Sequence, residues 1–280
     1  MTNDKVLTVQ DISCYGQCSL TVALPIISAC GVETAILPSA VLSTHTGGFT
    51  GYTFRDLTDD IPSIMNHWVK EGIGFDCIYT GYLGSIRQIE YVKELFNKVL
   101  KYGGLKIVDP AMGDNGKFYG GFNEEYAAAM AKLCSQAHII LPNITEACLM
   151  CGKEYIPDHH TKEYIKSLVY SLMDMGARRV VLKGVSYEEG KLGVVVCNAE
   201  TGEFKPYFND RQPRSSHGTG DCYAAALTGA LMQRKSIYES ATIAADFVVE
   251  CLRLTQGDES HGYGVKFEKA LPMLVNRLNN

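Results

Sequence analysis

Two short runs, Asp76-Cys77-Ile78-Tyr79 and Leu105-Lys106-Ile107-Val108, lie on either side of a helical pattern over residues 85–102. The two short runs are apolar at nearly every position, which is typical of strands buried on both faces. Gly103 and Gly104 fall where the helix is expected to end. A strand, a helix and a second strand in this order predict a parallel β-α-β unit with a right-handed crossover.

The same alternation extends along most of the chain. Further strands are expected at residues 6–9, 35–37, 137–141 and 179–182, and further helices at 19–30 and 161–175. After Gly184 the pattern changes to an antiparallel hairpin, with strands at 192–197 and 203–208, and two or three helices then follow Gly218. The prediction is an α/β fold in one domain over residues 1–280, with a mostly parallel sheet whose carboxyl-terminal edge binds the ligand.

Composition and charge exclude several functions. Of the 280 residues, 46% are hydrophobic and 20% charged, as in ordinary globular proteins. The net charge of −5 and the lack of a basic stripe predict that no nucleic acid is bound. No apolar run is long enough to span a membrane, no targeting segment precedes the first strand, and the ten cysteines are scattered. We therefore expect a cytoplasmic protein with free thiols and no membrane partner.

The sharpest chemical signal is Gly218-Thr219-Gly220-Asp221, followed by the small residues of a helix. Two glycines one residue apart let backbone N–H groups converge on an anion at the positive end of that helix. A carboxylate beside an anion site is repelled by phosphate unless it serves the chemistry, and Asp221 is placed to take the proton of an attacking hydroxyl. The competing interpretation is an ordinary glycine turn in which Asp221 caps the helix.

Other nucleotide motifs are absent. The chain has no G-x-x-x-x-G-K-[ST] run, which argues against a P-loop kinase. Position 223 is Tyr where a dinucleotide fingerprint has its third glycine.

Polar residues also follow the expected strands. Asp109 comes directly after one strand, and Asn143 and Glu146 come after the next, three residues apart at a helix start. Oxygen ligands of this kind suit Mg²⁺, with substrate phosphates completing the shell. The alternative is a capping box made by Asn143 and Glu146, and both interpretations can hold together.

Two polar loops near the N-terminus come from the same edge of the expected sheet. The loop after the first strand carries Asp11 and Tyr15, and the loop after the second carries His45 and Thr46. These residues are expected in one cleft, although polar loops occur on any protein surface.

Read together, these segments resemble the ribokinase-like superfamily and, within it, the pyridoxal and pyridoxamine kinases. The resemblance covers nearly the whole chain in order. It is carried by Ser43-Thr44-His45-Thr46, Thr80-Gly81-Tyr82-Leu83-Gly84-Ser85, Asp109-Pro110-x-Met112-Gly113, Asn143-x-x-Glu146 and Gly218-Thr219-Gly220-Asp221. It implies a three-layer sandwich with a small substrate flap, a homodimer, and ATP, Mg²⁺ and K⁺ as cofactors.

The resemblance also implies a role for each matching residue. Asp221 is the expected base, and the N–H groups of Gly218, Thr219 and Gly220 form the anion hole. Asp109 and Glu146 are the expected metal residues. Asn143, Lys183 and Ser186 are expected to contact ATP, and Asp11, Tyr15, His45, Thr46 and Tyr82 to surround the substrate ring.

The implied activity is phosphorylation of the 5′-hydroxymethyl group of pyridoxal, pyridoxamine or pyridoxine. One departure concerns the ring pocket, where Asp11-Ile12 stands in place of the Ser-His typical of the vitamin B6 kinases. A carboxylate there pairs with a protonated ring nitrogen or an amine. The alternatives are a hydroxymethylpyrimidine kinase of the same fold, less readily a sugar or nucleoside kinase, and a non-catalytic B6 or nucleotide-binding protein.

Overall fold

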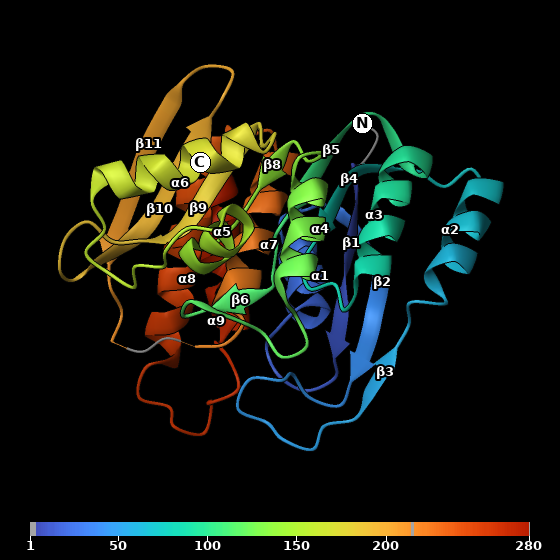
Figure 1. Cartoon of the computed structure of the whole chain (residues 1–280). Helices are drawn as coiled ribbons and strands as arrows, with labels where there is room; N and C mark the ends of the chain where they lie inside the picture. The colour runs from blue at the N-terminus through green and yellow to red at the C-terminus, as the bar shows by residue number, and fades with distance from the viewer. Residues whose placement is uncertain (1–3, 214–215, 280) are drawn as a thin grey trace.

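The computed structural model describes residues 4–213 and 216–279, most of whose strands form one large sheet between two layers of helices (Figure 1). The sheet has nine strands in the order β11-β10-β9-β8-β5-β4-β1-β2-β3. Its six central strands pair in parallel. They are β1 (Lys5–Ser13), β2 (Glu33–Leu42), β4 (Phe75–Thr80), β5 (Leu100–Val108), β8 (Ile139–Ile140) and β9 (Arg179–Val185). The expected α/β fold with a mostly parallel sheet is confirmed.

Antiparallel strands flank this parallel core. At one end β10 (Lys191–Asn198) pairs with β9 and with β11 (Glu203–Asp210), which confirms the hairpin predicted after Gly184. At the other end β3 (Phe54–Asp56) pairs with β2 and was not predicted. A separate short hairpin joins β6 (Gly113–Asp114) to β7 (Lys117–Phe118).

Helices cover both faces of the sheet. On one face lie α2 (Ile61–Lys70), α3 (Ile86–Lys98), α4 (Glu124–Cys134), α5 (Ile144–Cys151) and α6 (Lys162–Asp174). On the other lie α1 (Leu20–Ala29), α7 (Thr219–Met232), α8 (Ile237–Thr255) and α9 (Phe267–Asn279). The sequence did not indicate α2 or α4, but the three-layer arrangement is the expected one.

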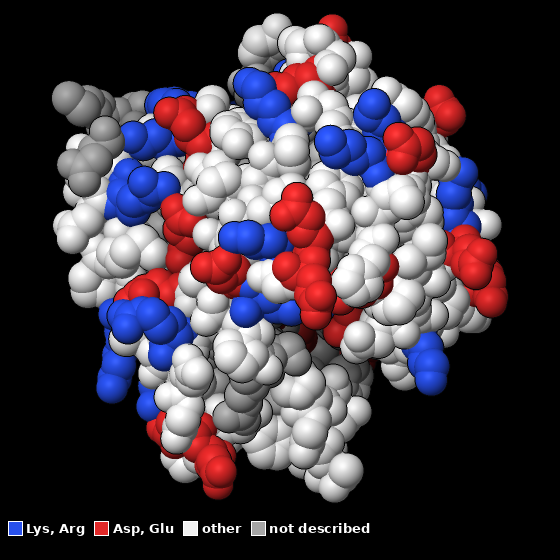
Figure 2. Space-filling view, turned by 90° about the vertical axis from the view of Figure 1, so that its left-hand side faces the viewer, with Lys and Arg blue, Asp and Glu red and all other residues white. Residues whose placement is uncertain are grey.

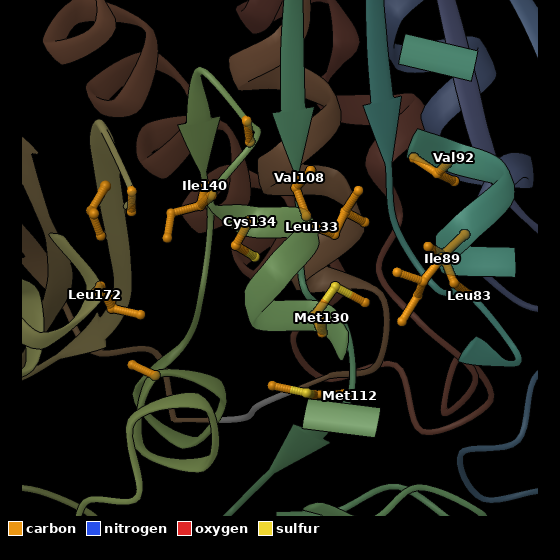
Figure 3. Close-up of a cluster of buried hydrophobic side chains, with 14 of the residues drawn as sticks. Leu83, Ile89, Val92, Val108, Met112, Met130, Leu133, Cys134, Ile140 and Leu172 are labelled. Carbon is orange, nitrogen blue, oxygen red and sulfur yellow. The ribbon is translucent and has the colours of Figure 1, made fainter. Parts of the chain in front are cut away.

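Two hydrophobic cores result, because successive strand residues point to opposite faces. In β5, Val108 belongs to the core under α3 and α4, whereas Ile107 belongs to the core under α1 and α7. Figure 3 shows part of the first core, where Val108 and Ile140 of the sheet meet Leu133 of α4. Each such side chain contributes about 1.5–3 kcal/mol when fully buried.

One predicted boundary is wrong. The helix expected over residues 85–102 ends at Lys98, and β5 begins at Leu100. Gly103 and Gly104 lie inside this strand, and its register against β4 shifts between Phe75 and Cys77. Gly103 has a φ of 76°, so the glycine that resembled a helix end instead permits an irregularity in a strand.

The parallel strands place the loops that follow β1, β2, β4, β5, β8 and β9 at one edge of the sheet. At the β10–β11 end, Lys and Arg side chains alternate with Asp and Glu over the surface (Figure 2). All ten cysteines are free thiols, as expected. Within the described residues, none of the helices has the length and apolar character needed to cross a membrane.

Candidate active site

A cavity of about 450 Å³ opens at the edge where the parallel strands end. Eight residues proposed from the sequence line it: Asp109, Asn143, Glu146, Lys183, Gly218, Thr219, Gly220 and Asp221. They come from four separate segments, and the fold brings them together because β5, β8 and β9 are neighbours and α7 begins beside them.

The glycine turn shapes one end of this cavity. Gly218 is the N-cap residue of α7 and has a φ of 76°, which only glycine adopts readily. A Cβ at this position would lie 1.6 Å from the backbone oxygen of Gln17, so no side chain fits. Because the first N–H groups of a helix have no acceptor within the helix, the start of α7 offers donors to an anion.

Asp221 lies in the first turn of α7 and is partly exposed at the cavity. Its Oδ2 accepts a hydrogen bond of 3.0 Å from the backbone N–H of Ser19. The pKa of Asp221 is raised to about 7, mainly by burial and also by the charges of Asp109 and Asp11, while the Ser19 N–H and Lys183 oppose the shift. Gly218, rather than Asp221, is the N-cap of the helix, so a capping role does not explain this carboxylate.

Lys183 and Asp109 form an ion pair across the floor of the cavity. The distance from Lys183 Nζ to Asp109 Oδ2 is 2.7 Å, and the two side chains are 14% and 6% exposed. Burial favours the neutral form of Lys183, but the charges of Asp109 and Glu146 outweigh it and hold the lysine pKa above its ordinary value. Lys183 is therefore a cation fixed at the cavity.

Asn143 and Glu146 form the capping box that the sequence left open as an alternative. Asn143 Oδ1 accepts from the Glu146 N–H at 2.8 Å, and Glu146 Oε2 accepts from the Asn143 N–H at 2.7 Å. Burial raises the pKa of Glu146 to about 8, with Asp109 adding to the shift and Lys183 opposing it. Both residues also line the cavity, so the capping box does not exclude a role at the site.

The donor set at this end suits a hard cation. Asp109 Oδ1 is buried and has no hydrogen-bond partner among the described residues, and Glu146 lines the same cavity. In the part of the chain that the structure describes, no group of three or more His, Cys, Asp or Glu side chains is arranged to hold a metal by itself. Two carboxylates are what Mg²⁺ commonly takes from a protein when phosphates and waters supply its other ligands.

The residues expected around the substrate ring form a second group, outside the cavity lining. Asp11 is buried, and both of its carboxylate oxygens accept hydrogen bonds: Oδ2 from Ser13 Oγ at 2.9 Å and Oδ1 from Ser19 Oγ at 2.6 Å. Burial raises the pKa of Asp11, and the two serine hydroxyls oppose the shift. The carboxylate is thus already engaged within the protein.

His45 is engaged in the same way. Its Nε2 lies 2.8 Å from the carbonyl oxygen of Tyr263, and its Nδ1 accepts from the Gly47 N–H at 3.1 Å. One nitrogen must donate and the other accept, which is the pattern of the neutral ring. Burial lowers the pKa of His45 accordingly. His45 therefore ties its own loop to the loop before α9, with both ring nitrogens occupied.

The remaining residues of this group lie nearby and are more open. Tyr15 is 52% exposed and packs on the ring of Tyr263, with 4.8 Å between centroids. Thr46 is exposed in the loop after β2. Tyr82 packs near Phe122, and burial together with the charge of Asp11 raises its pKa to about 12.

Ser186 lies away from the cavity. Its side chain is buried, its Oγ donates to the Glu188 carbonyl at 3.2 Å, and its backbone N–H donates to His160 Nδ1 at 3.0 Å. It is not among the residues that line the cavity, so its contacts shape the loop after β9.

Sequence reasoning missed two features of the site. One wall of the cavity is apolar and is built from β10 and α8 by Leu192, Val194, Ala245, Val248, Val249 and Leu252. The other feature is Ser19, which is buried with φ 55° and ψ −132°, a conformation costing about 1–3 kcal/mol for a residue other than glycine. In the sequence, the apolar residues of α8 look like ordinary core residues. No sequence pattern indicates that a serine has a strained backbone.

Comparison with known proteins accounts for most of the chain. Residues 24–265 match the family described as phosphomethylpyrimidine kinase. A hydroxymethylpyrimidine/phosphomethylpyrimidine kinase of Bacillus subtilis is 29% identical over 242 residues, covering 82% of this chain and 80% of that protein. A pyridoxine/pyridoxal/pyridoxamine kinase of Bordetella avium is 27% identical over 268 residues, covering 90% and 85%.

A solved structure agrees with these relatives. A protein of Bacteroides thetaiotaomicron, crystallised with pyridoxal, has a TM-score of 0.92 and 36% identity, covering 98% of this chain and 96% of that one. The family match, the fold and the arrangement of the site all lead to one conclusion: this chain is a kinase that belongs to the phosphomethylpyrimidine kinase family of the ribokinase-like superfamily.

Proposed function

We propose that the protein transfers the γ-phosphoryl group of ATP to the 5′-hydroxymethyl group of a vitamin B6 vitamer, with Asp221 as the base. The observation that carries this proposal is the position of Asp221. Its carboxylate meets the cavity in the first turn of α7, beside a glycine turn that offers N–H donors to an anion. A pKa of about 7 suits a base that must take a proton near neutral pH.

In this mechanism the residues of the chain bind, orient and neutralise. Asp221 accepts the proton of the acceptor hydroxyl as the hydroxyl oxygen attacks the γ-phosphorus in line, the bond from that phosphorus to the bridging oxygen breaks, and ADP leaves. The N–H groups of Gly218, Thr219 and Gly220 face the transferred phosphoryl group, and their fixed direction stabilises the charge that it carries. Lys183, held by Asp109, adds a positive charge at the same end.

The nucleotide fits the described cavity better than the acceptor does. The wall made by β10 and α8 suits a flat base, and the polar end with Lys183 and the start of α7 suits the phosphates. Asn143 also lines the cavity, beside Lys183, and its amide donates to the Gly113 carbonyl at 3.0 Å. Asp109 and Glu146 are the residues that would hold Mg²⁺, and the bound ion would supply positive charge to the phosphates.

The acceptor belongs on the opposite side of Asp221, near Tyr82 and the loops after β1 and β2. Support for a vitamin B6 vitamer comes from the pyridoxine/pyridoxal/pyridoxamine kinase relative and from the similar protein crystallised with pyridoxal. A second candidate is hydroxymethylpyrimidine, favoured by the family match and by the Bacillus subtilis relative. The phosphate machinery is the same for both, so only the acceptor distinguishes them.

The test is ADP release with Mg²⁺-ATP and each of pyridoxal, pyridoxamine, pyridoxine and 4-amino-5-hydroxymethyl-2-methylpyrimidine. The proposal expects the highest kcat/KM with a vitamin B6 vitamer. If only the pyrimidine is phosphorylated, the second candidate replaces the first. If no acceptor is phosphorylated while ligands still bind, the protein is a binder rather than a kinase of these substrates.

A further inference from the structure

Ser19 connects two carboxylates, those of Asp11 and Asp221. Its Oγ donates to Asp11 Oδ1 at 2.6 Å, and its backbone N–H donates to Asp221 Oδ2 at 3.0 Å. Asp11 comes from the end of β1 and Asp221 from the start of α7, 202 residues from Ser19. One small residue thus joins the candidate base to the end of a central strand.

The backbone of Ser19 is strained where it makes this connection. Its φ of 55° and ψ of −132° lie outside the regions that L-residues favour, and glycine reaches them at little cost. Such a conformation persists only where the surrounding structure imposes it. One constraint here is the hydrogen bond to Asp11, because Asp11 is buried in β1, a central strand of the sheet.

We propose that Ser19 is a positioning residue for the base: Asp11 anchors its hydroxyl, and the strained backbone aims its N–H at Asp221 Oδ2. This inference rests on the proposed function. Oδ1 of Asp221 is then the oxygen that takes the proton from the acceptor. Asp11, expected from the sequence to touch the substrate ring, acts through Ser19 instead.

The hydrogen bond has a chemical consequence besides orientation. An N–H that donates to a carboxylate stabilises the ionised form and lowers its pKa. The charged groups that face Asp221 are Asp109, Asp11 and Lys183, and the Ser19 N–H opposes the first two. Without the hydrogen bond from the Ser19 N–H, the Asp221 carboxylate loses its orientation and its pKa rises.

Two substitutions at Ser19 separate the backbone from the hydroxyl. Ser19→Ala removes the hydroxyl that is bonded to Asp11. Alanine, like serine, disfavours the strained φ and ψ of position 19, so we expect the backbone there to relax and its N–H to move away from Asp221. We expect kcat to fall by about 10- to 100-fold, the usual effect of a small misplacement of a reacting group. Ser19→Gly also lacks the hydroxyl, but glycine accepts the conformation, so kcat stays within about threefold of wild type.

Ser13→Ala is the matched control, because it removes the other hydroxyl from the same Asp11 carboxylate without touching Ser19. We expect it to keep the kcat of the wild type. Thermal unfolding of each variant shows whether the protein still folds. Equal loss in Ser19→Ala and Ser19→Gly, or wild-type kcat in Ser19→Ala, overturns the inference.

Asp11→Ala, made in wild type and in Ser19→Gly, tests the anchor. We expect Asp11→Ala to have a lower kcat than wild type. We expect the double variant Asp11→Ala/Ser19→Gly to have nearly the same kcat as Ser19→Gly. If Asp11 binds the acceptor instead, KM for the acceptor rises equally in both backgrounds while kcat holds, and the inference fails.

A readout without turnover separates this inference from the proposed function. In protein labelled with ¹³C at the Asp carboxyl carbons, the Asp221 signal is identified as the one missing from Asp221→Asn. Its titration should move to higher pH in Ser19→Ala but not in Ser19→Gly. If wild type phosphorylates no acceptor yet shows this difference, the proposed function is wrong and the positioning role stands; identical titrations in the two variants contradict the positioning role.

Discussion

Lys183 and Asp109 form a buried ion pair, with 2.7 Å between Lys183 Nζ and Asp109 Oδ2. The pair joins the ends of β9 and β5, which lie on either side of β8. It therefore fixes a positive charge at the cavity and also links β5 and β9 near their carboxyl ends, across β8.

Lys183→Met should destabilise the protein, because it leaves the Asp109 carboxylate buried without its partner. We expect the free energy of unfolding to fall by about 3–5 kcal/mol. Lys183→Met/Asp109→Asn, which removes both charges, should recover most of that loss. Urea unfolding at pH 8 measures both changes, and equal instability of the single and double variants would contradict the account.

The pH dependence of kcat/KM should follow the ionisation of Asp221. Burial raises its pKa to about 7, and a base works only when deprotonated. Activity should therefore rise about tenfold per pH unit below that value and level off above it. The rise should vanish from the residual activity of Asp221→Asn, and an identical rise in that variant would assign it to another group.

Gly218→Ala should destabilise the fold far more than Gly220→Ala. A Cβ on Gly218 would meet the Gln17 backbone oxygen at 1.6 Å, and φ there is 76°. A Cβ on Gly220 would meet only Lys183 Nζ, at 3.9 Å. Circular dichroism on heating is the measurement, and equal unfolding temperatures for the two variants would show that the backbone at Gly218 is free to move.

Val248→Trp should weaken ATP binding and leave acceptor binding unchanged. Val248 belongs to the apolar wall formed by α8, where a larger side chain occupies the space assigned to the base. We expect KM for ATP to rise by about tenfold or more, while KM for the acceptor stays the same. Val69→Trp, at an exposed position on α2, is the matched control. A rise in acceptor KM alone would place the acceptor in this cavity.

The sequence predicted the sheet well, because strands buried on both faces read as continuous apolar runs. Its main error, at Gly103 and Gly104, arose because glycine marks both helix ends and irregular strands. The short strand β3 has three residues, all exposed, and so offers no pattern to read.

The polar end of the site was also predicted, because its chemistry is local. Asp221 stands beside two glycines, and Asn143 stands three residues before Glu146. The apolar wall of the cavity and the role of Ser19 were not predicted, because both depend on contacts between residues far apart in the sequence. The hydrogen bond from Ser19 to Asp221 spans 202 residues of sequence. The engagement of Asp11 and His45 within the protein likewise appears only once the loops are folded.

The most direct test of the central claim is ADP release by wild type and by Asp221→Asn, with Mg²⁺-ATP and the best acceptor. The account predicts a loss of kcat of about 10²- to 10⁴-fold in the variant, with unchanged unfolding behaviour and little change in KM for ATP. Near-normal kcat in Asp221→Asn would contradict it, because the carboxylate at the start of α7 would then not be the base.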